Sequence, residues 1–242
     1  MIKDFIRTVR VRVVRAMASP RPCLDVSGRR VLIVAPHPDD EVFGCAGLVQ
    51  QLVQSGTQVD VAIMTGGGKS HAACCDLDEA TLIRKRRELA RMAAQIVGLP
   101  EPHLHFLDYP DGGIRLDHPE TERLRALLRE LRPDAVFVPH AGEGWPDHVE
   151  TGRIVRRLVM DRADVDVYAY CVWFWFYNVW RIDWSSARMV RLTPEQHRAK
   201  LSAIHTYVSA KAPCGRPWSG VLPRVFVWAN TWNRELYFKT KR

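Results

Sequence analysis

The chain has 242 residues, 47% of them hydrophobic, which suffices for one substantial core and predicts a single domain. Its apolar runs are four to six residues long, far below the roughly 20 needed to cross a bilayer, so we expect no membrane-spanning helix. The formal net charge is +8, but the basic residues are scattered and no recognised nucleic-acid motif accompanies them, so we expect no nucleic-acid partner.

We expect residues 1–28 to be a basic amphipathic segment that precedes one domain over residues 29–242. Arginines interrupt its apolar residues, unlike the apolar centre of a secretory signal, so we expect a cytoplasmic protein. If residues 1–20 are helical, apolar side chains recur every three or four positions, at Phe5, Ile6, Val9, Val13 and Met17. Two interpretations stay open: a helix peripheral to the inner face of an anionic membrane, or a basic, solvated helix packed on the domain.

Short β-rich runs then alternate with helical patterns. Strands are predicted at 31–35, 58–65, 103–107 and 135–138, and helices at 42–54, 78–97 and 119–131. A further helix is predicted to start at Asp147, its N-cap, and to run to about residue 160. This alternation predicts an α/β fold: a three-layer sandwich with a mainly parallel, Rossmann-like sheet. Ligands of such sheets bind at the carboxyl ends of the strands, where four polar segments follow: PHPDDE, TGGGKSH, DYPDGG and PHAGEGWPDH. We therefore expect the active site at that edge.

Residues 165–184 are apolar and aromatic, and six of them are Trp or Phe. The pattern is consistent with a strand that continues into an aromatic loop. Two interpretations are equally open for this stretch. It is either an edge strand packed into the core, or an aromatic wall that contacts a sugar or a lipid.

One imidazole and three carboxylates lie within five residues, His37-Pro38-Asp39-Asp40-Glu41, directly after the first strand. Crowded carboxylates raise one another's pKa unless a cation or hydrogen-bond donors compensate, and a divalent metal is the simplest compensation. Asp147-His148 lies on the same edge and supplies a further ligand. A His, His, Asp set leaves room for water, as catalytic zinc sites do, and it also suits Fe(II). For a hydrolase, zinc is the first choice.

These segments together resemble the LmbE/PIG-L deacetylases. The resemblance rests on PHPDDE, TGGG after the second strand, the turn at 110–112 and the later Pro146-Asp147-His148. The remainder of the chain agrees with the family pattern at Lys200, Ala203, Ile204, Tyr207, Ser209, Glu235 and Phe238. Covering residues 29–238, the resemblance implies a zinc-dependent hydrolase that removes the acetyl group from an N-acetylated amino sugar. Its substrate would be an N-acetylglucosamine-type glycoconjugate, a glycolipid or a secondary-metabolite intermediate.

The resemblance also assigns roles to single residues. It implies that His37, Asp40 and His148 hold Zn²⁺ and that Asp39 is the general base of the reaction. It further implies that the substrate contacts three residues from different segments: Gly67, Arg87 and Asp111.

The chain departs from the family pattern at Trp145, where many members have a histidine that stabilises the oxyanion or donates a proton. An oxyanion-hole donor is typically worth about 2.7–4 kcal/mol. His140 or the indole N–H of Trp145 is the candidate replacement. A catalytically weakened sugar- or lipid-binding relative of the same fold is the alternative function.

Overall fold

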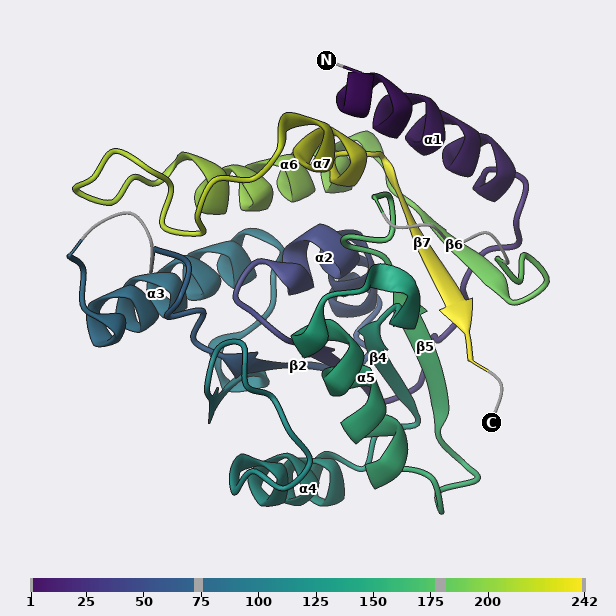
Figure 1. Ribbon diagram of the computed structural model, residues 1–242. Helices are drawn as coiled ribbons and strands as arrows, with labels where there is room; N and C mark the ends of the chain where they lie inside the picture. The colour runs from purple at the N-terminus through teal and green to yellow at the C-terminus, as the bar shows by residue number, and fades with distance from the viewer. Residues whose placement is uncertain (1, 72–75, 177–181, 241–242) are drawn as a thin grey trace.

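The computed structural model describes residues 2–71, 76–176 and 182–240. They form a seven-stranded sheet in the order β3-β2-β1-β4-β5-β7-β6 (Figure 1). The first five strands run parallel, whereas β7 pairs antiparallel with both β5 and β6. The strands are β1 (Val31–Ala35), β2 (Val59–Thr65), β3 (Leu104–Tyr109), β4 (Ala135–Pro139), β5 (Asp166–Tyr170), β6 (Ala187–Arg191) and β7 (Arg234–Lys239).

Helices cover both faces of the sheet and complete the three layers. Every residue of β1 is buried, since alternate side chains face opposite hydrophobic cores: Val31 and Ile33 one, Leu32 and Val34 the other. The first face carries α2 (Asp40–Gln54), α3 (Glu79–Ile96) and α6 (Pro194–Ser209), and the second carries α4 (Glu120–Leu131) and α5 (Pro146–Leu158). The predicted fold class is confirmed.

The antiparallel end of the sheet has its own hydrophobic cluster. Two helices pack there, α1 (Ile2–Ala18) and α7 (Arg224–Asn230). From α1 the buried residues are Val11, Val14 and Ala18. Among the described residues, no helix has the length and apolar character required to cross a membrane.

The C-terminal elements fix the position of α2. Glu235 on β7 accepts hydrogen bonds from the backbone N–H groups of Gly47 and Leu48 at 2.8 and 2.9 Å. Lys200 on α6 forms a buried ion pair with the same carboxylate at 2.8 Å. Since α2 begins at Asp40, these contacts to the helix also fix the position of the loop between β1 and α2.

Candidate active site

The loop between β1 and α2 brings its carboxylates to the edge of the sheet through an unusual backbone. Asp39 has φ 129°, a conformation that non-glycine residues rarely adopt and that stores about 1–3 kcal/mol of strain. Its N–H donates to Glu41 Oε2 at 2.9 Å, and its carbonyl accepts from Val42 and Phe43 at the start of α2. These hydrogen bonds to the first turn of α2 stabilise the strained conformation of Asp39.

Three side-chain atoms converge on one point. Asp40 Oδ2 lies 3.1 Å from His37 Nδ1 and 3.3 Å from His148 Nε2. Two ligands of a tetrahedral zinc ion, each at about 2.05 Å, are separated by roughly 3.3 Å. His37 comes from the loop after β1 and His148 from α5, so the sheet edge brings together segments more than a hundred residues apart in sequence.

Each of these histidines has its other ring nitrogen on a carboxylate. His148 Nδ1 lies 2.7 Å from Glu143 Oε2, and His37 Nε2 lies 3.2 Å from Asp147 Oδ2. Metal-binding histidines almost always make such a contact, which fixes the ring and the position of its proton. A second group of possible ligands, His37 with Asp111 and Asp147, contains a single histidine, whereas the first group has the two histidines and one carboxylate of many catalytic zinc sites. We therefore assign the candidate metal centre to His37, Asp40 and His148.

Both carboxylates behind the histidines are themselves anchored by backbone N–H groups. Glu143 is fully buried and accepts from the N–H groups of Val172 and Phe174. Asp147 lies in the first turn of α5, whose N-cap is Trp145, two residues before the helix start that the sequence pattern predicts. The Asp147 carboxylate accepts from Gly112 N–H at 2.7 Å.

The electrostatics of the cluster suit a cation. Burial acts to raise the pKa of Asp40, but His148 and His37 outweigh it and hold that pKa well below the usual range. Burial acts to lower the pKa of His148, and Asp40 with Glu143 raises it to about 9. In the metal-free protein the two histidines are therefore protonated near neutral pH. Because a metal must displace these protons, the affinity of the site for a metal rises with pH.

Asp39 lies beside this cluster and pairs with a buried arginine. Burial is the main cause that raises the pKa of Asp39, to about 8, and Arg86 opposes it. Arg86 Nη2 is 3.2 Å from Asp39 Oδ2 and donates to Pro38 O at 2.6 Å, while Nη1 donates to Gly67 O at 3.1 Å. Gly67 has φ +64°, and a Cβ there would overlap the guanidinium. The glycine thus makes room for Arg86.

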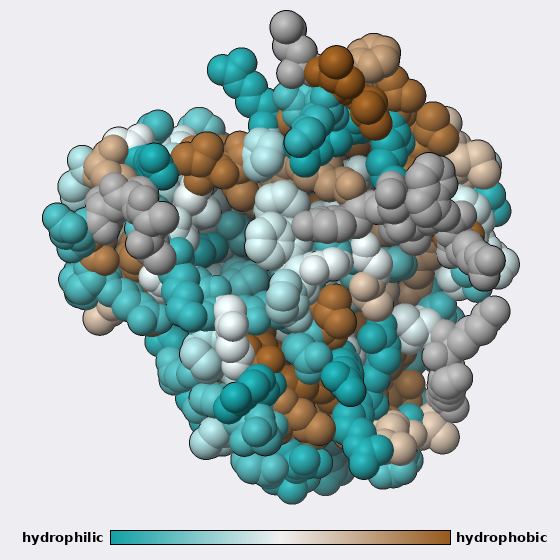
Figure 2. Space-filling view, viewed as in Figure 1, coloured by the Kyte–Doolittle hydropathy of each residue, from teal (hydrophilic) through white to brown (hydrophobic). Residues whose placement is uncertain are grey.

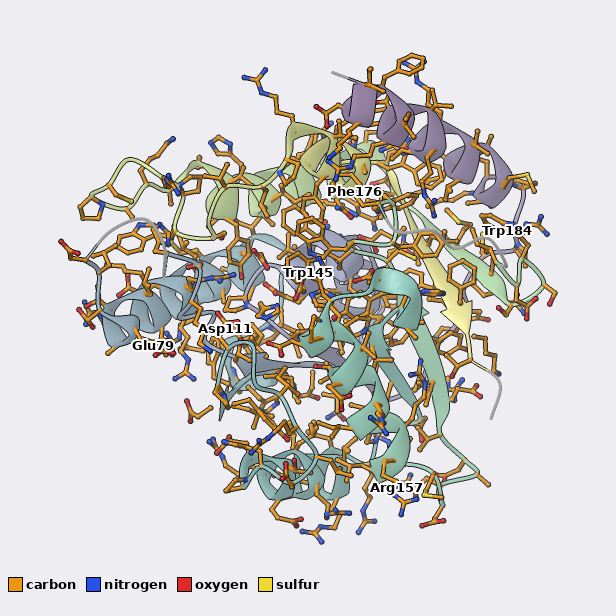
Figure 3. All side chains as sticks on the ribbon, in the orientation of Figure 1. Glu79, Asp111, Trp145, Arg157, Phe176 and Trp184 are labelled. Carbon is orange, nitrogen blue, oxygen red and sulfur yellow. The ribbon has the colours of Figure 1, made fainter. Side chains whose placement is uncertain are left out.

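The cluster opens into a cavity of about 300 Å³. One wall is aromatic and contains Trp145, Trp173 and Phe226, with the Trp145 and Trp173 rings 5.3 Å apart. Ser219 also lines the cavity, and its hydroxyl oxygen is buried without a hydrogen-bond partner among the described residues. In Figure 3, Asp111 and Trp145 lie on different loops in front of the sheet. The cavity therefore has both an apolar wall and polar lining residues such as Lys69 and Asp111.

Some residues that the sequence suggested lie elsewhere. Arg87 pairs with Asp108 at 2.6 Å and does not line the cavity; its neighbour Arg86 does. His140 is also outside the lining, because its ring packs on Phe174 and its Nδ1 accepts from the N–H of Gly142. Gly67 supports Arg86 and is not a lining residue.

Asp111 and Trp145 do line the cavity. Burial acts to raise the pKa of Asp111, but His37 and the N–H of Lys69 lower it to about 2. Four residues at the candidate site were not singled out individually by the sequence analysis: Arg86, Glu143, Trp173 and Ser219. Trp173 belongs to the aromatic stretch, which serves as core at Phe174 and as cavity wall at Trp173. Residues 177–181 of that stretch lie outside the described residues.

A larger cavity of about 760 Å³ lies at the amino end of β5. Its described lining includes Arg156, Arg188 and Lys239 but no histidine or cysteine. Size alone does not locate the chemistry, so the smaller cavity with the His-Asp-His cluster is the candidate site.

The sheet and the donor cluster at its carboxyl edge define the chain as an α/β protein with a candidate metal centre. The chain belongs to the PIG-L family: residues 32–159 match the family model described as GlcNAc-PI de-N-acetylase. The fold is similar to that of N,N'-diacetylchitobiose deacetylase from Pyrococcus horikoshii. The TM-score is 0.62 with 22% identity, over 83% of this chain and 78% of that one.

The chain is also similar in sequence to two deacetylases. The chain is 28% identical over 127 residues to the diacetylchitobiose deacetylase of Thermococcus kodakarensis, a match that covers 51% of this chain and 46% of that protein. It is 29% identical over 193 residues to a 1D-myo-inositol 2-acetamido-2-deoxy-alpha-D-glucopyranoside deacetylase of Mycobacterium sp., over 69% of this chain and 61% of that protein. The match thus spans about half to three fifths of the relatives' length.

Proposed function

We propose that the protein is a metal-dependent N-deacetylase that removes the acetyl group from an N-acetylated amino sugar of the N-acetylglucosamine type. The observation that carries the proposal is the convergence of His37 Nδ1, Asp40 Oδ2 and His148 Nε2, with Asp39 beside them in one cavity. The relatives support the reaction class, since their names describe deacetylases of diacetylchitobiose and of a 2-acetamido-2-deoxy-glucopyranoside.

We assign His37, Asp40 and His148 as ligands of a zinc ion. Nitrogen and carboxylate donors suit zinc, and a three-ligand set matches catalytic rather than structural sites. The same donors accept Fe(II), so the donor set does not separate the two metals. The chemistry that such a metal supplies is a lowered pKa of water, to about 7, and polarisation of the amide carbonyl.

Asp39 accepts a proton from the attacking water and then delivers it to the departing amine. To act as a base it must be ionised, although burial raises its pKa to about 8. A positive charge at the ligand cluster favours the ionised carboxylate, as Arg86 already does. The Arg86 ion pair and the backbone hydrogen bonds of Asp39 to Glu41, Val42 and Phe43 hold Asp39 beside the ligands.

The cavity wall binds and orients the sugar. The rings of Trp145, Trp173 and Phe226 present an apolar surface to one face of a sugar ring, while the Asp111 carboxylate accepts hydrogen bonds from its hydroxyl groups. Of the two candidates for oxyanion stabilisation, only Trp145 lines the cavity. We therefore assign that role to the indole N–H of Trp145.

The test is acetate release from a panel of N-acetylglucosaminides. We expect release by the native protein, loss on chelation and recovery when zinc is added. The replacement of a histidine by Trp145 favours one second candidate, a sugar-binding relative with weakened catalysis. That candidate predicts saturable binding of the same sugars without acetate, in the presence of zinc.

A further inference from the structure

Helix α1 presents an apolar stripe to solvent. Ile2 is 78% exposed and Phe5 is 70% exposed, and four further large apolar residues follow along the helix. We call this set the outer stripe: Ile2, Phe5, Ile6, Val9, Val13 and Met17. Their three- and four-residue spacing places them on one side of the helix. Figure 2 shows apolar side chains gathered over α1 at the top of the molecule. Contiguous exposed apolar patches of this kind mark interaction sites.

The outer stripe is not the side by which α1 packs on the domain. Val11, Val14 and Ala18 occupy the opposite side and are buried in the cluster with α7 and β6. Arg15 fixes the helix further, because its Nη2 donates to the carbonyls of Trp228 at 2.8 Å and Ala229 at 3.0 Å. The domain therefore holds α1 with its outer stripe pointing away.

Basic residues border the stripe. By helical spacing the exposed Lys3 lies along one edge and the exposed Arg12 along the other. Asp4 is the only acidic residue of the helix, and the whole chain carries a net charge of +8. A second copy of the chain would place like charges against each other across the stripe, which is unfavourable. An anionic lipid surface complements both the apolar stripe and its basic borders.

We propose that α1 lies flat on an anionic bilayer, with the outer stripe at the boundary between headgroups and acyl chains. Lys3 and Arg12 then contact the headgroups, as in interfacial amphipathic helices. Here the folded domain orients the helix in advance, because the inner side is already packed. Membrane docking needs no catalysis, so it stands or falls separately from the deacetylase function.

Two aromatic rings, Phe176 and Trp173, lie between α1 and the cavity. Arg7 Cζ lies 4.5 Å above the Phe176 ring, which is 5.8 Å from Trp173 in the cavity wall. Figure 3 shows Phe176 between Trp145 and α1. Docking through α1 thus brings the cavity wall close to the membrane, where an amino sugar displayed at the surface can enter. This last step rests on the proposed function; the docking itself does not.

Co-sedimentation of the full chain with vesicles tests the docking. We expect binding to phosphatidylcholine mixed with phosphatidylglycerol, weak binding to phosphatidylcholine alone, and weaker binding at high salt. In Val9→Glu/Val13→Glu the apparent association constant for mixed vesicles should fall about tenfold or more, since burying one valine alone is worth about that factor. Met92→Glu on α3 is the matched control; Met92 is also an exposed apolar residue, 52% accessible, and this change should leave binding unaltered.

Val9 and Val13 are 43% and 56% exposed, so the double variant should keep the native unfolding midpoint, which excludes misfolding as the cause. Equal binding of native protein and double variant would overturn the proposal, as would equal binding to neutral and anionic vesicles. A native dimer that the double variant converts to monomers, with no vesicle binding, would also overturn it and assign the stripe to a contact between two copies.

Discussion

Glu143 determines which nitrogen of His148 carries a proton. Its Oε2 accepts from Nδ1 at 2.7 Å, which leaves Nε2 with a lone pair directed at the candidate metal position. In Glu143→Gln, the amide oxygen can keep the backbone N–H bonds of Val172 and Phe174, and the amide NH₂ then faces Nδ1. An NH₂ group only donates, so Nδ1 must accept and the proton moves to Nε2. That tautomer cannot bind a metal through Nε2.

The expected loss in zinc affinity is about 10- to 100-fold, or roughly 1.4–2.8 kcal/mol. Above about pH 9, where His148 is neutral in the metal-free protein, stability should change by less than about 1 kcal/mol, because a glutamine side chain has nearly the same shape as glutamate and the hydrogen bonds to Val172, Phe174 and His148 remain. Glu143→Ala should differ: it leaves His148 and two backbone N–H groups unpaired at a fully buried position, which costs about 3 kcal/mol or more.

Zinc affinity is measured by competition with a chromophoric chelator, and stability by urea unfolding of the metal-free chains. The reasoning is refuted if Glu143→Gln binds zinc as tightly as the native protein, or if it loses as much stability as Glu143→Ala.

Two further predictions concern the surroundings of the site. Gly67→Ala should lower the free energy of unfolding in urea by about 1–3 kcal/mol, because the positive φ at this position is strained for alanine. Acetate release should also fall, since the added Cβ would displace Arg86 from Asp39. An unchanged free energy of unfolding would contradict the packing argument. Burial lowers the pKa of His140 to about 4. Between that value and about 6.5 the unfolded chain binds the additional proton, so the free energy of unfolding should fall as pH falls, by up to about 3 kcal/mol. His140→Gln should flatten this slope in unfolding measurements between pH 7 and 4, and an unchanged slope would show that other groups cause it.

The first two thirds of the fold followed from the sequence because strands and helices there alternate and are each long enough to show a period. The edge rule for parallel sheets then placed PHPDDE and PDH together, although more than a hundred residues separate them. No comparable sequence pattern predicted β6 and β7, which pair antiparallel at one end of the sheet. Their pairing depends on contacts distant in sequence.

Individual side chains were harder to place. Arg86 and Arg87 are adjacent on α3, and only the close approach at Gly67 determines that Arg86 faces the cavity. The contact between Glu143 and His148 Nδ1 requires the 3₁₀ turn before α5, which has no sequence period. Likewise, the apolar pattern of α1 predicted an amphipathic helix, but the domain packs on Val11 and Val14 instead of the outer stripe.

The central claim is that one metal and Asp39 together remove an acetyl group. Metal content and acetate release should be measured for the native protein and for Asp39→Asn, which suits the left-handed backbone at this position. We predict about one zinc per chain in both proteins, and acetate release lowered about 10²- to 10⁴-fold in the variant. Zinc bound equally with acetate release unchanged would contradict the role of Asp39, and a native chain that binds no metal would contradict the account as a whole.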